Sequence, residues 1–415
     1  MELKIGNIRA SSLVKEFKTP LYVYDQEKIE DTLLTFKKYF YSDKFATKIL
    51  YASKAFQAIA LLNILSKFGF GLDVVSQGEL YSALKSNMAK DEIYFHGNNK
   101  SPAELNFAIV KSGISHIVVD NFMELKEIVK ICQINKKNIN VMLRLNVGIE
   151  AHTHEYIITS HVDSKFGMAF DSSELKKCLK LIEENSEVNL EGFHSHIGSQ
   201  IFDMTAWHAA IDKLIGYLAQ FDQPLSLNIG GGFGIPYTAS DQPLEIRDVL
   251  KSLVKRVEED LDKEKISLNS LMIEPGRSIV AEAGTTLYTV GYQKETPNKK
   301  YVFVDGGMGD NLRPSLYKAK YSCSLANKLN EEASDVVTIA GKYCESGDVL
   351  IESVELPKAL AGDILAVYCT GAYGYSMASN YNRNPIPGVV FVKNGQAREV
   401  IKRQSMEDLI QGEIY

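Results

Sequence analysis

Short apolar runs alternate with longer segments that have apolar residues at helical spacing, from about residue 45 to about residue 280. The runs are rich in Val, Ile, Leu and Phe and do not alternate cleanly between apolar and polar positions, which is expected of strands buried on both faces. The pattern therefore predicts eight parallel strands, at KILYAS, GLDVVS, IYFHG, HIVVD, NVMLRLNV, LEGFHSHI, LSLNIG and LMIEPG.

Most intervals between these runs predict an amphipathic helix. The segment FQAIALLNILSKFG closes at Gly69, and SPAELNFAIVKSG opens with a Ser-Pro-x-Glu cap and closes at Gly113. The segments SSELKKCLKLIEEN and EIRDVLKSLVKRVEEDL have the same periodicity. Eight strand–helix units over roughly 240 residues match a (β/α)8 barrel in number and size. We expect this TIM-like α/β barrel rather than the alternative, an open doubly wound sheet.

The pattern changes after about Ala283, where strand-like runs with turn signals replace the helical periodicity. This change predicts a C-terminal all-β domain of the sandwich or barrel type. The N-terminal run TPLYVYD is also strand-like and precedes the barrel. We therefore expect a barrel over residues 28–282, and a β domain made of residues 1–27 and 283–415 in which the N-terminal strand pairs with the C-terminal part.

Composition excludes several classes of protein. The net charge is −6, and we find no long basic run that would indicate binding to nucleic acid or to an anionic membrane. We also find no apolar run long enough to span a bilayer and no signal-peptide pattern at the N-terminus. The five cysteines include no C-x-x-C pair, so a disulfide framework or a structural zinc site is not expected. A reduced cytoplasmic protein fits these features best.

Polar residues fall at the ends of the predicted strands, where (β/α)8 barrels carry their catalytic groups. Their gathering at one end of most strands predicts a single pocket. A lysine after a buried strand is either a surface side chain with its charge in water or an amine aimed into a pocket to form a Schiff base. The polar set is Lys54, Asp73, Ser76, His96, Arg144, His194, His196, Ser199, Gly230, Gly231, Gly232, Glu274 and Arg277.

The glycine-rich turn NIGGGFGIPY follows the seventh strand, in the region that often binds phosphate in this kind of barrel. Glycine backbone allows N–H groups to approach a phosphate closely, although the glycines could simply form a turn. A lysine able to form an imine, a phosphate turn and a nearby carboxylate, Glu274, together suggest pyridoxal phosphate. The alternative for Glu274 is a surface salt bridge.

His196 has three interpretations: a core histidine, a metal ligand together with His194, or a flat ring against the cofactor. His152 and His154 add to the metal alternative. No cysteine or carboxylate set occurs at ligand spacing, so we expect no metal ion.

Ten motifs follow one another along the chain: YASKAF, GLDVVSQGEL, RLNVGIEAHTHEYI, SKFGM, GFHSHIGSQ, GGGFGIPY, EPGR, DGGMGDNLRPSLY, CESGD and GAYGYSMASNYN. Taken together and in this order, they make a highly specific set that covers nearly the whole chain. With these motifs the sequence resembles the diaminopimelate decarboxylases, a family of barrel-type, alanine racemase-like, pyridoxal-phosphate-dependent decarboxylases.

The resemblance implies a carboxy-lyase that converts meso-2,6-diaminopimelate to L-lysine and CO2, the last step of lysine biosynthesis. It implies that Lys54 forms the Schiff base, that Glu274 pairs with the pyridine nitrogen, and that Cys344 donates a proton. Further cofactor contacts would be His196, Ser199, Gly230, Gly231, Gly232, Pro275, Gly276, Arg277 and Tyr373. Substrate contacts would be Arg277, Arg313, Tyr317, Glu345 and Tyr373. Cys344 and Glu345 would come from a second subunit, which implies a homodimer.

Three functions of the same fold are the alternatives: a decarboxylase of ornithine, arginine or lysine, an alanine-racemase-like isomerase, and a regulatory protein that binds the cofactor without turnover. Glu274 argues against the isomerase, which needs a weak electron sink. The chain departs from the usual motifs at Phe56, where asparagine is common, at Gln77, where glycine is common, and in GKY before Cys344.

Overall fold

The computed structural model describes residues 1–149 and 164–414, so His152 and His154 lie outside the described residues. The described chain divides into two compact units. The barrel unit comprises Thr32–Gly234 and Pro243–Gly276 without the undescribed stretch, and the β unit comprises the rest of the described chain.

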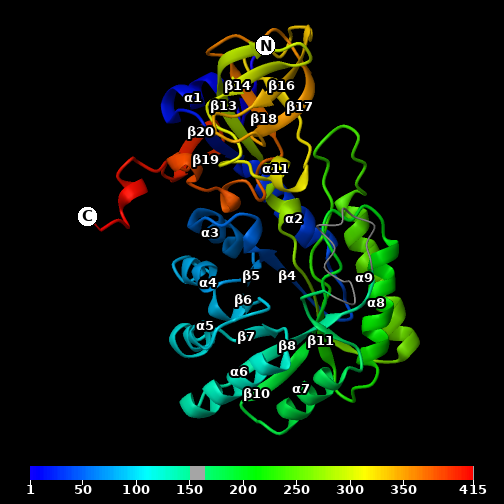
Figure 1. Ribbon diagram of the computed structural model, residues 1–415. Coiled ribbons are helices and arrows are strands. Elements are labelled where there is room, and N and C mark those ends of the chain that lie inside the picture. Colours follow the sequence, from blue (N-terminus) through cyan, green and yellow to red (C-terminus); the bar gives the residue numbers. More distant parts are fainter. Residues whose placement is uncertain (150–163, 415) are drawn as a thin grey trace. The chain divides into compact units, whose positions relative to one another are not determined.

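The barrel unit contains a closed sheet of parallel strands, which confirms the barrel prediction (Figure 1). Strands that follow one another along the chain are neighbours in the sheet, including β8 and β10, and the pairing of the last strand, β12, with the first, β4, closes the ring. All eight predicted runs form strands of this ring. They are β4 (Ala46–Ala52), β5 (Gly71–Val74), β6 (Ile93–Phe95), β7 (His116–Val119), β8 (Ile139–Asn146), β10 (Val188–His194), β11 (Leu225–Asn228) and β12 (Leu268–Ile273), with the short β9 (Met168–Ala169) beside β8.

Helices follow most of the strands and surround them in Figure 1. The predicted capping box is present at Ser101, and Gly113 ends that helical segment in the left-handed conformation, with φ 67°. The α-helices here are α2 (Gln26–Tyr39), α3 (Ile59–Lys67), α4 (Gln77–Ala83), α5 (Pro102–Asn106), α6 (Phe122–Asn135), α7 (Ser173–Glu183), α8 (Thr205–Leu218) and α9 (Ile246–Glu264). Shorter helical turns are η1 (Ser53–Ala55), η2 (Lys90–Glu92) and the π-helical η3 (Phe107–Ser112).

The interior of the barrel is filled by side chains. One buried cluster takes Leu50, Tyr94, Val118, Met142 and Met272 from five different strands. Because the interior is filled, a ligand site is expected in the loops at the carboxyl ends of the strands.

The β unit is built on a mixed sheet in the order β17-β16-β14-β13-β3-β19-β20, with β18 pairing with β13 and β15. The N-terminal strand β3 lies antiparallel to β13 and parallel to β19. The predicted β-rich C-terminal part is therefore confirmed. Its strands are β3 (Leu21–Asp25), β13 (Gly284–Glu295), β14 (Lys300–Val304), β15 (Cys323–Leu325), β16 (Asp335–Ala340), β17 (Val349–Leu356), β18 (Ile364–Tyr368), β19 (Gly388–Lys393) and β20 (Gln396–Ile401), besides the small pair β1 (Lys4–Ile5) and β2 (Ile8–Arg9).

Side chains from several of these strands, including Leu21, Leu287, Ala366 and Val390, make one core. Helical elements of the β unit are α1 (Ala10–Phe17), α10 (Arg277–Val280), α11 (Arg313–Tyr317), η5 (Tyr375–Met377), η6 (Tyr381–Arg383) and η7 (Asp408–Ile410). Among the described residues, no helix has the length and apolar character that a membrane span requires.

Candidate active site

Lys54 lies in the short turn η1, directly after strand β4. The residues on both sides of it, Ser53 and Ala55, are buried, whereas Lys54 itself is exposed. The turn at Gly276 packs on the same strand end, because a β-carbon there would lie 3.0 Å from that of Ala52 and 3.1 Å from that of Ala55. Pro275 also accepts a hydrogen bond from the N–H of Ala52, at 3.1 Å. The lysine and the predicted EPGR segment are therefore neighbours.

Phe56 has a structural explanation. Its side chain is fully buried, and its carbonyl accepts a hydrogen bond of 2.7 Å from the hydroxyl of Tyr51. A large apolar residue thus fills the core at the position where the family usually has asparagine.

The carboxylate of Glu274 is the centre of a buried polar cluster at the strand ends. Asn228 donates its side-chain N–H to Oε1 at 2.7 Å, and the ring of His194 contacts Oε2 at 3.1 Å. The Nε2 atom of His96 lies 3.1 Å from Oε1 and 3.8 Å from Asp73. Sequence reasoning placed His96 and His194 in the pocket but did not identify Asn228, whose only signal was its position at the end of a strand.

Electrostatics keep this carboxyl group ionised. Burial alone would raise the pKa of Glu274, but its contacts with His194 and His96 hold the pKa well below the usual range. Burial lowers the pKa of His194 to about 4, so its ring is neutral at pH 7. The nearby oxygen is that of a carboxylate, so the neutral ring places its N–H at Nε2 and donates to Glu274. An ionised, oriented carboxylate is the group that a protonated pyridine nitrogen requires.

Three side chains of this cluster are close enough together to bind a metal ion. The ligand atoms of His96, His194 and Glu274 lie within 4.8 Å of one another. The metal alternative raised from the sequence paired His194 with His196, but His196 has a different role in the structure. Its Nδ1 accepts a hydrogen bond of 3.1 Å from the N–H of Gly231, which orients the ring.

The glycine turn after β11 is required by close packing of the backbone. A β-carbon at Gly230 would lie 2.6 Å from the carbonyl oxygen of Ser195, and one at Gly231 would lie 2.2 Å from that of Glu274. The N–H of Gly230 donates to Asn228 at 2.9 Å, and that of Gly231 donates to His196. Two of the three N–H groups expected to cradle a phosphate are therefore used within the protein. These two glycines shape the site and orient its side chains.

Three other polar residues predicted in the pocket, Ser76, Ser199 and Arg144, have contacts or positions of their own in the barrel unit. Ser76, predicted on the second strand, lies beyond β5 and caps helix α4 through a hydrogen bond from the N–H of Glu79. Serine at this place is explained by its ability to satisfy the free N–H groups of a helix start. Ser199 is half-buried in the loop that carries His196. The guanidinium group of Arg144 lies 3.9 Å from Asp120 and 4.5 Å from the ring centre of Phe166.

Within the β unit, two buried arginines share one aromatic ring. The guanidinium carbons of Arg277 and Arg313 lie 5.6 Å and 4.8 Å from the ring centre of Tyr237, and the hydroxyl of Tyr237 accepts a hydrogen bond from Arg277. The hydroxyl of Tyr321 accepts one from Arg313. Sequence reasoning identified both arginines and missed both tyrosines, although Tyr237 ends the quoted motif GGGFGIPY. Planar, fixed cations of this kind are suited to carboxylates.

Tyr373 contacts one arginine of this pair, and Tyr317 shares a short helix with the other. The ring of Tyr373 lies 4.8 Å from the guanidinium carbon of Arg277. Its backbone has φ 59°, an unfavourable conformation for a large residue and one that is common at functional sites. Tyr317 ends helix α11, four residues after Arg313 and so on the same helix face.

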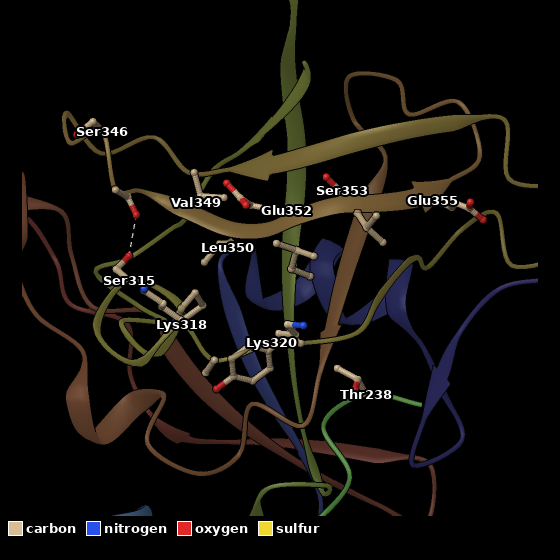
Figure 2. Close-up of a pocket in the computed structure, with 16 residues that line it drawn as sticks. Thr238, Ser315, Lys318, Lys320, Ser346, Val349, Leu350, Glu352, Ser353 and Glu355 are labelled. Atoms are coloured by element: carbon tan, nitrogen blue, oxygen red, sulfur yellow. Dashed lines mark hydrogen bonds between the residues drawn. The ribbon is translucent and has the colours of Figure 1, made fainter. Parts of the chain in front are cut away.

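Cys344 and Glu345 lie on an exposed turn between β16 and β17. A groove of about 940 Å³ runs beside this turn, between β17 and the segment that contains α11 (Figure 2). The hydroxyl of Ser315 on α11 donates to the carbonyl of Gly347 at 2.7 Å, as the dashed line in Figure 2 shows. This bond connects the helix of Arg313 with the turn of Glu345.

A buried carboxyl group in the motif DGGMGDN gives a pH prediction. Burial raises the pKa of Asp310 to about 7, although the N–H of Gly307 donates to it. Because this folded pKa lies above the unfolded value of about 3.9, the folded state binds the proton more tightly. The protonated Asp310 therefore contributes to the free energy of unfolding. This contribution is fully present below about pH 4 and is lost as the pH rises to about 7.

We expect the Asp310→Asn variant to keep its stability as the pH rises from about 4 to about 7, because the amide mimics the neutral acid and does not ionise. Thermal unfolding at pH 5 and at pH 8 should show a smaller drop in melting temperature for the variant, by an amount worth on the order of a few kcal/mol. Replacement of the exposed Asp222 by asparagine is the control and should leave the drop unchanged. An equal drop in Asp310→Asn and wild type would contradict the assignment.

Comparisons with known proteins agree with this geometry. Residues 26–281 match the family model described as pyridoxal-dependent decarboxylase, pyridoxal binding domain. The chain is 46% identical to diaminopimelate decarboxylase of Bacillus subtilis over 414 residues, covering 98% of this chain and 94% of the relative. It is 34% identical to the solved diaminopimelate decarboxylase of M. jannaschii in complex with L-lysine, with a TM-score of 0.92, covering 100% of this chain and 96% of that one. The structure is also similar to a lysine/ornithine decarboxylase from Vibrio vulnificus, with a TM-score of 0.76 over 92% of this chain and 97% of that one. The two sequences are 22% identical, so this likeness supports the fold and not the function.

The fold, the polar cluster and these matches define a barrel-type decarboxylase that depends on pyridoxal phosphate. The chain belongs to the diaminopimelate decarboxylase family. It is therefore an enzyme of the carboxy-lyase class.

The residues present fit this cofactor. The strand ends offer an amine at Lys54, an ionised carboxylate at Glu274, and a glycine turn that leaves no room for β-carbons. The other ring nitrogen of His194, Nδ1, is buried and has no hydrogen-bond partner among the described residues. A polar ligand with several acceptors and donors matches such a site.

Proposed function

We propose that the protein decarboxylates meso-2,6-diaminopimelate to L-lysine and CO2, the last step of lysine biosynthesis. The observation that carries the substrate assignment is the pair of buried arginines, Arg277 and Arg313, on the ring of Tyr237. Diaminopimelate has two carboxylates, and two fixed guanidinium groups are suited to them. Ornithine, arginine and lysine have a single carboxylate, so as substrates they offer no carboxylate to the second of these guanidinium groups.

The barrel unit holds the cofactor in this proposal. Lys54 binds it through its amine, Glu274 accepts the N–H of the pyridine nitrogen, and the ring of His196 lies against it. When bound, pyridoxal phosphate supplies a ring that takes up the electron pair left when carbon dioxide departs. Glu274 stabilises the charge that favours this uptake. Further contacts are assigned to Ser199, Gly230, Gly231, Gly232, Pro275 and Gly276 of the barrel unit, and to Arg277 and Tyr373 of the β unit.

The β unit supplies groups that act on the substrate. Arg277, Arg313 and Tyr317 hold its carboxylates, and Tyr373 contacts both substrate and cofactor. Glu345 accepts from the ammonium at the far end of the substrate. Cys344 delivers its thiol proton to the α-carbon after carbon dioxide has left, as a general acid.

We also propose that the enzyme is a homodimer in which Cys344 and Glu345 serve the substrate bound to the other subunit. Their exposure on a turn of the single chain supports this assignment. By function we propose a barrel domain over residues 28–282 and a β domain over residues 1–27 and 283–415; the compact β unit of the structure also includes residues 28–31, 235–242 and 277–282. The proposed location is the cytoplasm, where five unpaired cysteines stay reduced.

The shared site predicts complementation between inactive variants. We expect Lys54→Ala and Cys344→Ala proteins to be nearly inactive alone and to regain activity when their subunits are mixed and exchanged. One site of each hybrid dimer then has both residues, so the mixture should approach about a quarter of wild-type activity if half of the dimers are hybrids. Continued inactivity after subunit exchange has been verified by mass spectrometry would rule out the shared site.

The substrate is tested by comparing kcat/KM for meso-diaminopimelate, L-lysine, L-ornithine and L-arginine, with carbon dioxide as the readout. We expect a preference for diaminopimelate of at least about a hundredfold, because the other substrates leave one buried guanidinium group without a carboxylate. Equal or greater turnover of ornithine, arginine or lysine would establish the related decarboxylase instead. Binding of the cofactor without carbon dioxide from any of the four would indicate a regulatory protein.

A further inference from the structure

The turn that carries Cys344 and Glu345 is closed by one carboxylate. Asp348 accepts the N–H of Tyr343 at 2.8 Å through one oxygen and the N–H of Met308 at 2.7 Å through the other. Its own N–H donates to the carbonyl of Glu345 at 3.1 Å. Asp348 thus fixes the two ends of the turn and leaves the orientation of its tip to other contacts.

A second segment, Asn380–Arg383, holds the tip of the turn. The side-chain oxygen of Asn382 accepts the N–H of Cys344 at 2.8 Å, and the hydroxyl of Tyr381 donates to Oε2 of Glu345 at 3.3 Å. The ring of Tyr381 is parallel to that of Tyr343, with 6.1 Å between their centres and 6° between their planes. Each of the two residues with a proposed chemical role therefore has its own partner in this segment, and GKY before Cys344 supplies the ring on which Tyr381 lies.

Asn382 is suited to this task by its backbone as well as its side chain. It has φ 50°, a left-handed conformation that asparagine and glycine adopt more easily than other residues. Glycine would share the conformation but would lack the acceptor for Cys344. Asparagine combines both properties.

The contact of Tyr381 also affects charge. Hydrogen bonds from the N–H of Gly347 and from the hydroxyls of Ser346 and Tyr381 lower the pKa of Glu345. The carboxylate is therefore charged at neutral pH and can accept from an ammonium group.

We propose that Asn382 and Tyr381 are positioning residues, Asn382 for the proton donor Cys344 and Tyr381 for the specificity carboxylate of Glu345. This inference rests on the proposed function, because it takes the roles of Cys344 and Glu345 from there. Neither residue needs to touch the substrate. Asn382 acts on the protonation step, and Tyr381 acts on recognition of the far end of the substrate.

Asn382→Gly in the holoenzyme tests the first role, because it removes the acceptor and keeps the left-handed backbone. We expect kcat for meso-diaminopimelate to fall about five- to tenfold, as for the loss of one hydrogen bond, with the cofactor's absorbance unchanged. Asn382→Asp keeps an acceptor and should stay within about twofold of wild type. Asn394→Gly makes the same replacement at φ 52° in the β19–β20 turn and should have no effect.

A double-mutant cycle with Cys344→Ala separates this inference from the proposed function. If Asn382 acts through Cys344, Asn382→Gly should lower kcat in the wild-type background and have little effect in the Cys344→Ala background. An equal loss in both backgrounds, or no loss in the wild-type background, overturns the role of Asn382 while Cys344 keeps its own. Full activity of Cys344→Ala itself overturns both.

Tyr381→Phe tests the second role, because it removes only the hydroxyl and keeps the ring beside Tyr343. We expect KM for meso-diaminopimelate to rise about three- to tenfold with kcat nearly unchanged. The change should be small in a Glu345→Gln background, where the charged acceptor is already absent. An unchanged KM in the Glu345 enzyme, or a fall in kcat alone, would overturn the assignment of Tyr381.

Discussion

Replacement of Lys54 by alanine is expected to abolish both the cofactor's visible absorbance and the activity. The amine lies directly after β4, and the segment with the carboxylate of Glu274 packs on the same strand end. Without the amine the protein has no covalent attachment for the cofactor at this position, and we expect kcat to fall by roughly a thousandfold or more. Absorbance spectra of the purified protein with added pyridoxal phosphate, together with carbon dioxide release, measure both effects.

Lys48 provides a matched control on the same strand. It lies six residues earlier on β4, where it is 3.9 Å from Glu92, and has no assigned role. Lys48→Ala should keep the absorbance and stay within about twofold of wild-type activity. An unchanged spectrum in Lys54→Ala would show that the assigned lysine is not the attachment point.

Replacement of Glu274 by glutamine is the second large expected effect. Glutamine retains the length of the side chain and one oxygen acceptor but removes the negative charge. We expect kcat to fall about a hundred- to a thousandfold, the usual loss when a group that stabilises developing charge is removed. Cofactor absorbance should remain, because Lys54 is intact, so the loss appears in turnover and not in binding.

Glu191 is the control for this change. It is also a barrel carboxylate that contacts a histidine, His116, at 2.6 Å, and it accepts a hydrogen bond from Tyr94 at 2.8 Å. Because it lies within β10 and not at the strand end, Glu191→Gln should keep kcat within about twofold of wild type once the protein is folded. Equal kcat values for Glu274→Gln and wild type would remove Glu274 from the charge-stabilising role.

The fold was largely readable from the sequence because its signals are local. Strands buried on both faces give continuous apolar runs, and every predicted run forms a strand of the closed barrel. Ser76 was placed wrongly on a strand because a serine after an apolar run looks the same whether it continues the strand or caps the next helix.

The sequence predicted the residues of the site that have a chemical role, but it predicted few of the residues that contact them. Lys54, Glu274 and Arg313 occur in motifs, whereas Asn228 and Tyr237 act through contacts with residues distant in the sequence. No local pattern reports such contacts. The glycine turn shows the same limit, since the sequence indicated close approach of the backbone but not that His196 accepts one of its N–H groups.

The most direct test of the whole account is the stoichiometry of products from meso-diaminopimelate. Purified protein with pyridoxal phosphate should release one carbon dioxide for each L-lysine formed, and protein freed of the cofactor should release none until it is added back. Racemised or unchanged diaminopimelate without carbon dioxide, in protein that has bound the cofactor, would contradict the account.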